Sequence, residues 1–587
     1  MCGIIGYAGK KTAAPIVLQG LKRLEYRGYD SVGIASINGS GVICKKGAGK
    51  IDDVHAKMRL DDLEGTLCIG HTRWATHGGV TDENSHPHFS CDNRIAVAHN
   101  GIIENYLTLK NELIAEGHVF RSQTDTEVIP HLLEKLVKQG LQLPEAAQKV
   151  GELIEGRNTF LAIMDGDNRL VAFRRGSPLV AGIGAGEYFL ASDIPAFMEY
   201  TKDVVYLYDD DVVVVDGEFK VFNKGKRVER PVDTISWSVE QVQKGNFDHY
   251  MMKEIAEQAE TIQRAIAQDP QVVMQIADQI KRANKVFIVA CGSAGYACLA
   301  GSYFLAKIAK VHAVPVIASE FRNYVNFLDK DSLVLAVSQS GETADVLEAV
   351  NASKERSAMV ISIVNVMGSS LMRSSDKSLL ANAGPEFCVA TTKAYTAQMA
   401  IMPLLAYACA GKFEEGKNKL KGIYNDVYNL TSASTRRHIH DLAERLRYAE
   451  HMYIIGRDVN WATAMEATLK IKEIAYIHAE AFAGAELKHG VIALIEKGTP
   501  CIVFVSQDNA KETMSNAIEL KARGGWIIGV GSERHPEFDY WIKVPEAGDL
   551  NPILQTIPMQ ILGYELGVVR QCEIDKPRNL AKSVTVK

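Results

Sequence analysis

Residues 305–322 read LAKIAKVHAVPVIASEFR, and residues 471–488 read IKEIAYIHAEAFAGAELK. The two stretches align without a gap, and the identical residues of the first are Ile308, Ala309, His312, Ala313 and Glu320, which recur as Ile474, Ala475, His478, Ala479 and Glu486. Further along, VSQ at 337–339 recurs at 505–507. Similarity that keeps its register indicates repeated structural units. We therefore predict that the second half of the chain holds two copies of one domain.

Each copy alternates strand-like and helix-like segments. KVFIVA, LVLAVS and VISIV precede helical patterns in the first copy, as MYIIG, CIVFVS and WIIGVG do in the second. This alternation is typical of an open parallel sheet covered by helices. We place the two α/β domains at 248–425 and 426–575, followed by a tail at 576–587.

Residues 1–225 have a different pattern. SVGIASI, RIAVAHN, TFLAIMD, RLVAFRR, EYFLASD and VVYLYDDDVVVVDG are short β-rich runs separated by turn residues. Helical patterns occur near PIVLQGLKRLEY and TEVIPHLLEKLVKQG. Strands with segregated helices indicate a layered α+β domain. The polar, irregular stretch 226–247 is predicted to be a linker.

Composition excludes several classes of function. The chain has 587 residues, a net charge of -6 and no long run of Lys and Arg, so nucleic acid is not an expected partner. Neither a membrane-spanning apolar run nor a signal peptide is recognisable, and AYTAQMAIMPLLAYACAG is predicted to be a buried helix. The ten scattered cysteines form no CxxC pair, which favours a reducing cytoplasm without disulfides or a structural metal. The HPH at 86–88 is also interpreted as a non-metal feature.

The N-terminal MCGIIGYAGK raises the possibility of a catalytic thiol. Removal of Met1 would leave Cys2 beside a free α-amine, which titrates near neutral pH, at about 7.7–8.0, and could act as its base. The simpler interpretation is that Cys2 only begins a strand.

The first copy contains VSQSGET where the second contains VSQDNAK. A hydroxyl-rich, glycine-containing turn between a strand and a helix favours an anion at the helix N-terminus, whereas an aspartate would repel a phosphate. We expect Ser338, Gln339, Ser340 and Thr343 to bind one phosphate, assisted by Ser293 in CGSAG. The motif is not a nucleotide-binding P-loop, because its lysine is missing.

The second copy carries charge instead. Lys470 and Glu473 are three residues apart on one helical face, and Glu473 aligns with Lys307 of the first copy. His489 follows in AELKHG. A carboxylate, a lysine and a histidine could open a sugar ring and move a proton between adjacent carbons. Ordinary surface positions remain the alternative for each of them.

Several motifs carry a resemblance to a known family. MCGIIGYAG, LEYRGYDSVGIA, HTRWATHG, HNGIIEN and SQTDTE resemble the glutaminase domain of N-terminal-nucleophile amidotransferases, which implies an αββα fold. With SQSGETAD, VATTKA, LKIKE, ELKHG and PRNLAKSVTVK, the full chain resembles the glutamine–fructose-6-phosphate aminotransferase (isomerizing) family, the glucosamine-6-phosphate synthases. The resemblance implies a glutaminase domain followed by two sugar isomerase domains, and transfer of the glutamine amide nitrogen to fructose 6-phosphate.

Residue by residue, the resemblance also implies roles. In the glutaminase domain, Cys2 is the nucleophile, Asn100 and Gly101 form the oxyanion hole, and Trp74 gates the ammonia passage. The glutamine would be held by Arg73, Thr76, His77 and Asp125. In the isomerase half, Val389 and Thr391 would contact the sugar. The catalytic residues would be Lys470, Glu473, His489 and Lys582. The resemblance places His489 in the neighbouring subunit's site, so a homodimer is expected, with no cofactor.

Two residues depart from the family's usual pattern. Ala294 replaces a second hydroxyl residue after Ser293, which would remove one phosphate hydrogen bond. Val491 replaces a proline near His489, which affects the expected loop geometry. Feedback regulation by a sugar nucleotide has no support in the short linker.

Three alternatives remain. An amidotransferase feeding another acceptor would need a pyrophosphate or nucleotide motif, and none is found. An isomerase pair acting on a different ketose phosphate is compatible with the sequence. A non-catalytic sugar-phosphate sensor would be expected to have lost its nucleophile or base, yet Cys2 and Glu473 are both present.

Overall fold

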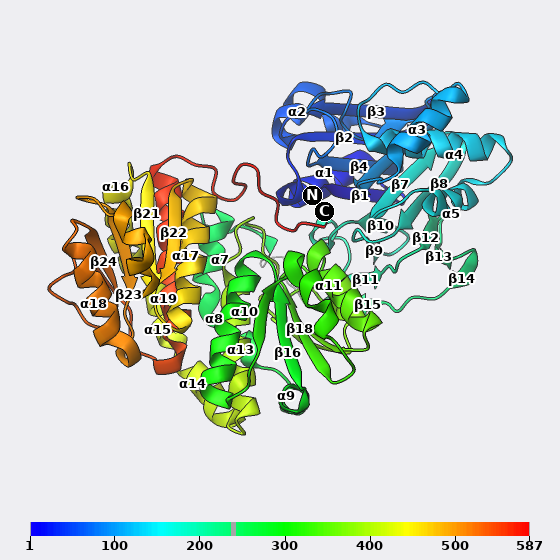
Figure 1. The fold of residues 1–587 in the computed structure, drawn as a ribbon. Helices are drawn as coiled ribbons and strands as arrows, with labels where there is room; N and C mark the ends of the chain where they lie inside the picture. Colours follow the sequence, from blue (N-terminus) through cyan, green and yellow to red (C-terminus); the bar gives the residue numbers. More distant parts are fainter. Residues whose placement is uncertain (1, 236–241, 586–587) are drawn as a thin grey trace. The chain divides into compact units, whose positions relative to one another are not determined.

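The computed structural model describes residues 2–235 and 242–585. It divides into two compact units, Met1–Gln243 together with Ala581–Lys587, and Lys244–Leu580 (Figure 1).

The first unit contains two antiparallel sheets. The eight-stranded sheet has the order β15-β11-β9-β10-β1-β4-β2-β3, and the seven-stranded sheet has the order β14-β13-β12-β8-β7-β6-β5. The strands of the first sheet are β1 (Gly3–Ala8), β2 (Ser31–Asn38), β3 (Gly41–Ala48), β4 (Leu67–Arg73), β9 (Val180–Ile183), β10 (Tyr188–Ala191), β11 (Asp203–Tyr206) and β15 (Asp233–Thr234). Those of the second are β5 (His88–Phe89), β6 (Ile95–Gly101), β7 (Asn158–Met164), β8 (Asp167–Arg174), β12 (Asp211–Val215), β13 (Phe219–Asn223) and β14 (Lys226–Val228).

The apolar faces of these strands explain the layers. Buried residues from both sheets, such as Ile69 and Leu161, form one core between the sheets. The other face of the seven-stranded sheet packs against α3 (Tyr106–Ala115), α4 (Val128–Lys138) and α5 (Leu143–Leu153). On the eight-stranded sheet, α1 (Ala13–Leu24) packs against β1 and β4, and α2 (Ile51–Met58) follows β3. The predicted αββα layering is confirmed.

The predicted linker at 226–247 differs from the structure in its first part. Strand β14 pairs with β13 at the edge of one sheet, and β15 pairs with β11 at the edge of the other. The first unit accordingly extends to Gln243 rather than ending at 225. These strands were missed because short edge strands can be polar and exposed, so they lack the apolar alternation of interior strands. Residues 236–241 of the predicted linker lie outside the described residues.

The second unit contains two five-stranded parallel sheets with matching strand orders, β17-β16-β18-β19-β20 and β22-β21-β23-β24-β25. The first comprises β16 (Lys285–Ala290), β17 (Val314–Ile317), β18 (Ser332–Ser338), β19 (Met359–Val364) and β20 (Lys377–Leu380). The second comprises β21 (His451–Gly456), β22 (His478–Ala483), β23 (Pro500–Phe504), β24 (Trp526–Gly531) and β25 (Tyr540–Lys543). The duplicated stretches both lead from a helix end into the edge strand, β17 or β22. The predicted repeat of an α/β domain is therefore confirmed.

Helices join the two copies into one core. Buried residues of β16 and β21 belong to the same apolar cluster as those of α8, α13, α17 and α19, so one face of each sheet packs on a shared helical layer. Smaller clusters cover the outer faces. The helices of this unit are α7 (Tyr250–Ala256), α8 (Gln258–Ile266), α9 (Pro270–Arg282), α10 (Gly292–Phe304), α11 (Ala344–Glu355), α12 (Ser370–Ser374), α13 (Lys393–Cys409), α14 (Phe413–Gly422), α15 (Tyr424–Leu430), α16 (Ala433–Leu446), α17 (Val459–Ala475), α18 (Ala510–Lys521) and α19 (Asn551–Val569).

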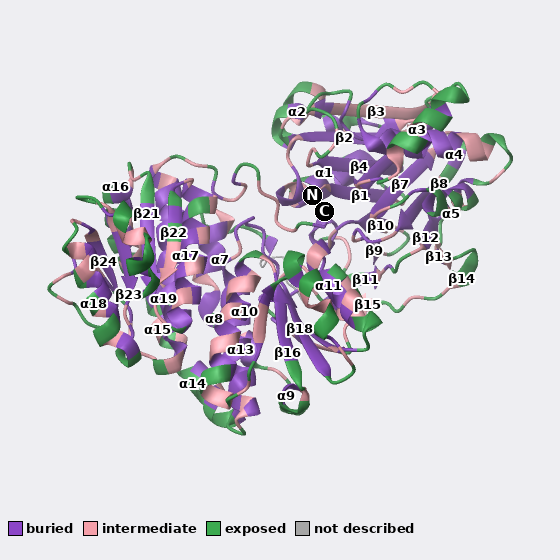
Figure 2. Ribbon diagram, in the orientation of Figure 1, coloured by how far each residue is buried: buried purple, intermediate pink, exposed green. Residues whose placement is uncertain are grey.

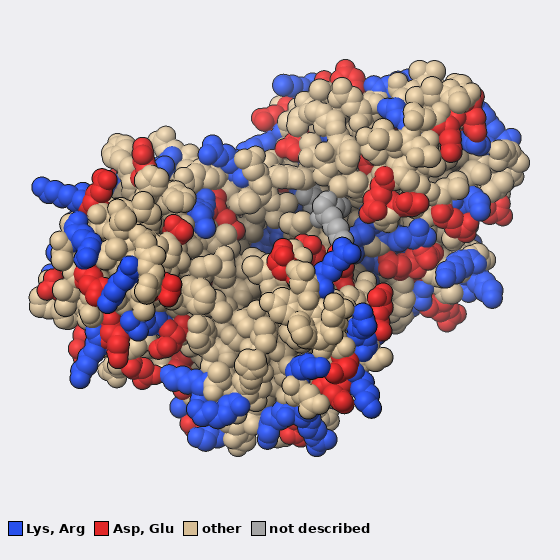
Figure 3. All heavy atoms as spheres, in the orientation of Figure 1, with Lys and Arg blue, Asp and Glu red and all other residues tan. Residues whose placement is uncertain are grey.

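Burial and charge follow this layering. Figure 2 shows the strands mostly buried and exposed residues on outer helices such as α18. Helix α13 is almost wholly buried, as predicted for this apolar segment. No helix among the described residues is long and apolar enough to span a bilayer. On the face drawn in Figure 3, acidic and basic side chains are interspersed.

The core between the two sheets yields a stability prediction. Leu161 is 0% exposed in that core, and its replacement in Leu161→Ala leaves a cavity that should cost about 2–5 kcal/mol. We expect the unfolding transition of the first unit to shift down by several °C in calorimetry. Leu107→Ala is the matched control, because Leu107 is 60% exposed. Equal shifts for the two variants would contradict the assigned core.

Candidate active sites

Cys2 lies directly before β1, a central strand of the eight-stranded sheet. Its Sγ accepts a hydrogen bond from the Trp74 backbone N–H at 3.3 Å and lies 3.5 Å from the Trp74 carbonyl oxygen. Burial raises the pKa of the thiol, while the Trp74 N–H and the charge of Arg73 oppose that shift. The thiol is therefore held at a fixed place beside groups that favour its anion.

Asn100 and Gly101 end β6 next to Cys2. The Asn100 Nδ2 donates to the Cys2 carbonyl oxygen at 3.1 Å, and a side-chain amide has a second hydrogen to offer. Gly101 has φ +149°, and a Cβ there would lie 2.2 Å from the Arg157 carbonyl oxygen. Only glycine fits, so the strand end keeps this close approach of two backbones.

Arg73 ends β4 and is buried, and its side chain bonds to the loop that follows the strand. Its guanidinium donates to the backbone carbonyls of His77, Gly78 and Gly79, with 3.1 Å to Gly78 and 3.0 Å to Gly79. It therefore shapes the loop that carries Thr76, which is exposed, and His77, whose ring packs edge-on against Tyr106.

Asp125 begins the short 3-10 helix before α4 and is buried. Its Oδ2 accepts from the Ile103 backbone N–H at 2.8 Å. Burial lowers the pKa of Arg73, and the charges of Cys2 and Asp125 oppose that shift. The four segments that carry Cys2, Asn100, Arg73 and Asp125 thus converge at one end of β1, β4 and β6.

The SQSGET segment lies between β18 and α11, the predicted strand–turn–helix context. Ser338 Oγ lies 3.1 Å from Thr343 Oγ1 and accepts from the Gly341 N–H at 3.0 Å. Thr343 is the N-cap of α11. Gly341 has φ +66°, and a Cβ would lie 2.1 Å from Ser369 Oγ, so the turn requires glycine.

Lys470 is the centre of a buried charge cluster on α17. Its Nζ lies 2.7 Å from Glu473 Oε2 and 3.6 Å from Glu466 Oε1. Lys470 and Glu466 are each 1% exposed. Burial raises the pKa of Glu466 to about 7, an increase that Lys470 opposes and Glu473 reinforces. The paired carboxylates raise the pKa of Lys470 despite burial.

Residues of the first copy lie around this cluster. Ser293, at the start of α10, is buried, and its hydroxyl lowers the pKa of Glu466. Helices α10 and α17 pack against each other. The loop before α13 holds Val389, which is buried, and Thr391, whose hydroxyl bonds to Glu386. Ala294 packs at the edge of the shared core.

An ion pair joins a residue of the first copy to a residue of the second. Lys307, which aligns with Glu473, lies 2.5 Å from Asp508, which aligns with Ser340. If a twofold axis relates the two copies, which share one strand order, then Ser340 of the first copy lies near Glu473 of the second, just as Asp508 lies near Lys307. This equivalence predicts that the phosphate-loop candidates of one copy face the charged helix of the other.

Two further predicted residues come from other segments of the chain. His489 is exposed in the 3-10 helix Glu486–His489, and Val491 begins the next one, a position that also suits proline. Lys582 is half-buried in the segment Ala581–Lys587, which belongs to the first unit. Among the described residues, no contact joins His489 to Glu473.

Glu466 is a candidate that sequence analysis missed. It stands four residues before Lys470, which is the spacing of an ordinary surface ion pair on a helix. The usable signal was its apolar setting in WATAMEATLKI, where an unpaired carboxylate would be costly.

Comparison with known proteins agrees with this geometry. The glutamine amidotransferase domain family matches residues 71–199, and the SIS domain family matches 279–408 and 445–566. The glutamine–fructose-6-phosphate aminotransferases (isomerizing) of Thermococcus kodakarensis and Clostridium tetani are 42% and 41% identical, each over 100% of both chains. A solved C-terminal domain of glucosamine-fructose-6-phosphate aminotransferase from Francisella tularensis covers 57% of this chain and all of its own, with 32% identity and a TM-score of 0.51.

The two SIS matches coincide with the duplicated α/β copies, and the amidotransferase match lies within the unit that positions Cys2. With identity above 40% across its full length, this chain belongs to the glutamine–fructose-6-phosphate aminotransferase (isomerizing) family.

Proposed function

We propose that the chain performs its family's reaction, glutamine-dependent amination of fructose 6-phosphate with isomerisation to glucosamine 6-phosphate, through the residues described above. The observation that carries the assignment is the convergence of Cys2, the Trp74 N–H and the Asn100 amide at the start of β1. An N-terminal thiol beside preorganised donors is suited to acyl transfer from an amide.

In the glutaminase step, the Cys2 sulfur attacks the side-chain carbonyl carbon of glutamine, and its own α-amine accepts the thiol proton. Asn100 and the Gly101 N–H stabilise the oxyanion, a contribution typically worth about 3–4 kcal/mol. The α-amine returns this proton to the amide nitrogen, which leaves as ammonia, and water then hydrolyses the thioester to glutamate and restores the thiol. The substrate α-carboxylate takes the place of loop carbonyls on Arg73, while Asp125 binds the α-ammonium.

Ammonia must stay unprotonated to act as a nucleophile. In bulk water near neutral pH it is mostly ammonium, so a protected route to the sugar is needed. Trp74 contributes its backbone to the Cys2 contacts, and its indole packs edge-on against Tyr29 at 5.6 Å. We assign Trp74 as the gate, with Thr76 and His77 lining the glutamine pocket.

In the isomerase step, the sugar phosphate binds the SQSGET turn at Ser338, Gln339, Ser340 and Thr343, with Ser293 nearby. Backbone N–H groups at the start of α11 and the hydroxyls supply the donors. Glu473 moves the proton between C1 and C2, and Lys470 holds its carboxylate at 2.7 Å. Val389 and Thr391 contact the sugar.

Glu466 is a positioning residue for Lys470. The lysine ammonium is fully buried and has three donors, so a second carboxylate fixes its direction toward Glu473. A buried cation without that partner would be strongly disfavoured.

The remaining groups imply an assembly. His489 is exposed in this chain, which suits a histidine that assists ring opening in a neighbouring subunit, so we propose a homodimer. Lys582 completes the sugar site from the C-terminal tail. All ten cysteines are free thiols, which supports a cytoplasmic location.

The first test concerns the nucleophile. Glutamine labelled with nitrogen-15 in its amide should give labelled glucosamine 6-phosphate, and Cys2→Ala should lower that rate on the order of 10³-fold or more. Cys44→Ala is the matched control, because Cys44 is also a half-buried cysteine of the first unit. Release of glutamate and labelled ammonia without labelled aminosugar would leave the glutaminase assignment standing and refute the acceptor.

The second test concerns the phosphate turn. Loss of one hydroxyl to phosphate in Ser340→Ala should raise KM for fructose 6-phosphate roughly tenfold or more and leave glutaminase activity unchanged. Ser302→Ala is the control, since that hydroxyl bonds to Leu299 of its own helix at 2.7 Å. An unchanged KM in Ser340→Ala would remove this turn from the site.

The third test uses the pKa of Glu466. An unfolded glutamate has a pKa of about 4.3. The buried carboxyl of Glu466 has a pKa of about 7, so between these two pH values the folded state keeps a proton that the unfolded state has lost. Folding stability should therefore fall as pH rises through this window, by up to about 1.4 kcal/mol per pH unit.

Glu466→Gln removes that dependence. Its melting temperature, measured from about pH 5 to 7, should fall less with rising pH than that of the unmodified chain. Sugar isomerisation should decrease while glutaminase activity stays constant. Parallel stability curves for the two proteins would show that Glu466 does not titrate in this range.

A further inference from the structure

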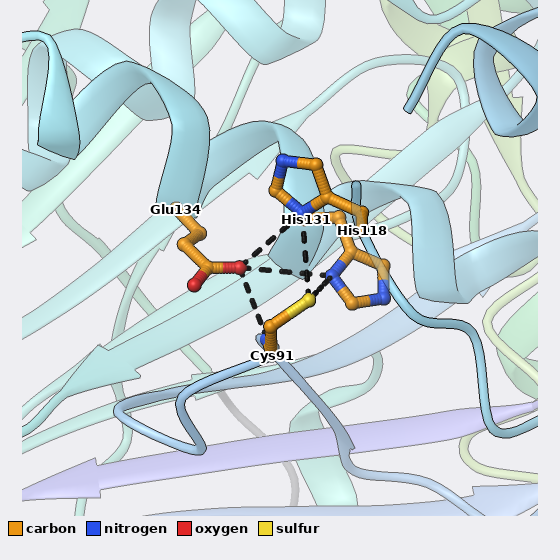
Figure 4. Close-up of side chains that lie close together, drawn as sticks. All are labelled: Cys91, His118, His131 and Glu134. Atoms are coloured by element: carbon orange, nitrogen blue, oxygen red, sulfur yellow. Dashed lines mark hydrogen bonds and ion pairs between the residues drawn. The ribbon is translucent and has the colours of Figure 1, made fainter. Parts of the chain in front are cut away.

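Four side chains of the first unit converge away from the glutamine pocket. Cys91 lies in the turn between β5 and β6, and His118 follows α3, while His131 and Glu134 are three residues apart on α4. Figure 4 shows their sulfur, ring nitrogens and one carboxylate oxygen directed toward one another. One ligand atom of each lies within 4.8 Å of all the others.

The separations agree with coordination around one ion. Cys91 Sγ lies 3.6 Å from His118 Nδ1 and 3.5 Å from His131 Nδ1. Bond lengths of about 2.3 Å for Zn–S and 2.0–2.1 Å for Zn–N in a tetrahedron place sulfur and nitrogen about 3.5 Å apart. The same geometry places nitrogen and oxygen about 3.3 Å apart, against 3.4 Å and 3.8 Å from Glu134 Oε2 to the two Nδ1 atoms.

Surrounding groups hold the four ligand atoms in place. The Val119 backbone N–H donates to Cys91 Sγ at 3.3 Å, which favours a thiolate, and the Cys91 N–H donates to Glu134 Oε2 at 3.0 Å. Lys138 takes the other Glu134 oxygen at 2.7 Å. The Nε2 of His131 lies 3.6 Å from a Glu127 carboxylate oxygen, on the side away from the cluster. Carboxylates behind a ligating histidine orient the ring in metal sites.

The local backbone explains how these residues meet. The His118 N–H bonds to the Leu113 carbonyl at 2.9 Å after the end of α3, and Gly117 has φ +94°, so the chain turns back toward α4. The side chains of His131 and Glu134 are 1% and 2% exposed, and that of His118 is 12% exposed. The cluster is therefore mostly shielded from water.

We propose that Cys91, His118, His131 and Glu134 bind one Zn²⁺ ion. Thiolate, imidazole and carboxylate in a four-ligand arrangement suit zinc, whereas magnesium and calcium prefer oxygen ligands alone. The thiolate and the carboxylate balance the charge of the cation. Four protein ligands leave no open position, so the site is structural rather than catalytic.

The position of the site gives it a consequence for the glutaminase pocket. The ion would tie the turn before β6, the end of α3 and the middle of α4 together. Strand β6 continues to Asn100, and α4 follows directly from the segment that starts at Asp125. Zinc therefore stabilises the frame on which two glutamine-pocket residues are built, without touching the substrate.

The test measures metal content in the full-length chain. Protein loaded with zinc and freed of excess metal should carry one ion per chain by elemental analysis. Cys91→Ser and His118→Gln should lower that content at least about tenfold, and Cys44→Ser, which changes a half-buried cysteine outside the cluster, should not. A Cys2→Ala background excludes the N-terminal thiol as an adventitious ligand.

Two further measurements separate binding from misfolding. Cobalt added to the metal-free protein should give a thiolate-to-cobalt charge-transfer band and intense visible bands typical of a tetrahedral site, and both should be absent in Cys91→Ser. Zinc should raise the melting temperature of the unmodified chain and of Cys44→Ser only. A folded unmodified chain that binds neither ion would show a hydrogen-bonded cluster only and overturn the proposal, as would full zinc content in folded Cys91→Ser.

Discussion

The buried ion pair of Lys470 is the interaction on which the organisation of the second unit depends. A fully buried ammonium is tolerated only when carboxylates and a dry, close-packed surrounding accompany it. Glu473 provides the charge at 2.7 Å, Glu466 stands 3.6 Å from the ammonium with a raised pKa, and α19 provides the packing. A Cβ at Gly563 of α19 would lie 3.3 Å from the backbone of Lys470, so a glycine lets the helices approach closely.

The same requirement explains why neither copy of the duplicated domain is sufficient. Helix α17 packs against α19 of its own copy and against α10 of the other. Without the first copy, one side of the charged helix would meet water, and the pKa of Glu466 would return toward its ordinary value. The common apolar cluster is thus a condition for the chemistry of the cluster as well as for stability.

Local patterns of the sequence predict several features of the fold. The strand–turn–helix of SQSGET, the buried helix α13 and the duplication all follow from neighbours in the chain, and the structure confirms them. Glu466 was missed because burial decides its role, and burial depends on the other copy. Cys91 and His131 were missed because they are 40 residues apart and only the packing of α4 beside β6 joins them. Strands β14 and β15 were missed because edge pairing needs no apolar pattern.

The duplication creates two sets of equivalent positions, and only one set carries the residues that we assign to the sugar site. At one pair of equivalent positions stand Ser340 and Glu473, to which we assign phosphate binding and proton transfer. In the reciprocal arrangement, Lys307 bridges Asp508 at 2.5 Å and Asp549 at 2.9 Å. These carboxylates satisfy the lysine and raise its pKa to about 12, and they would repel a phosphate. A lysine in place of a carboxylate, and a carboxylate in place of a hydroxyl, therefore give an ion pair between the copies at the second set of positions. This difference accounts for the single sugar site that we propose for each chain.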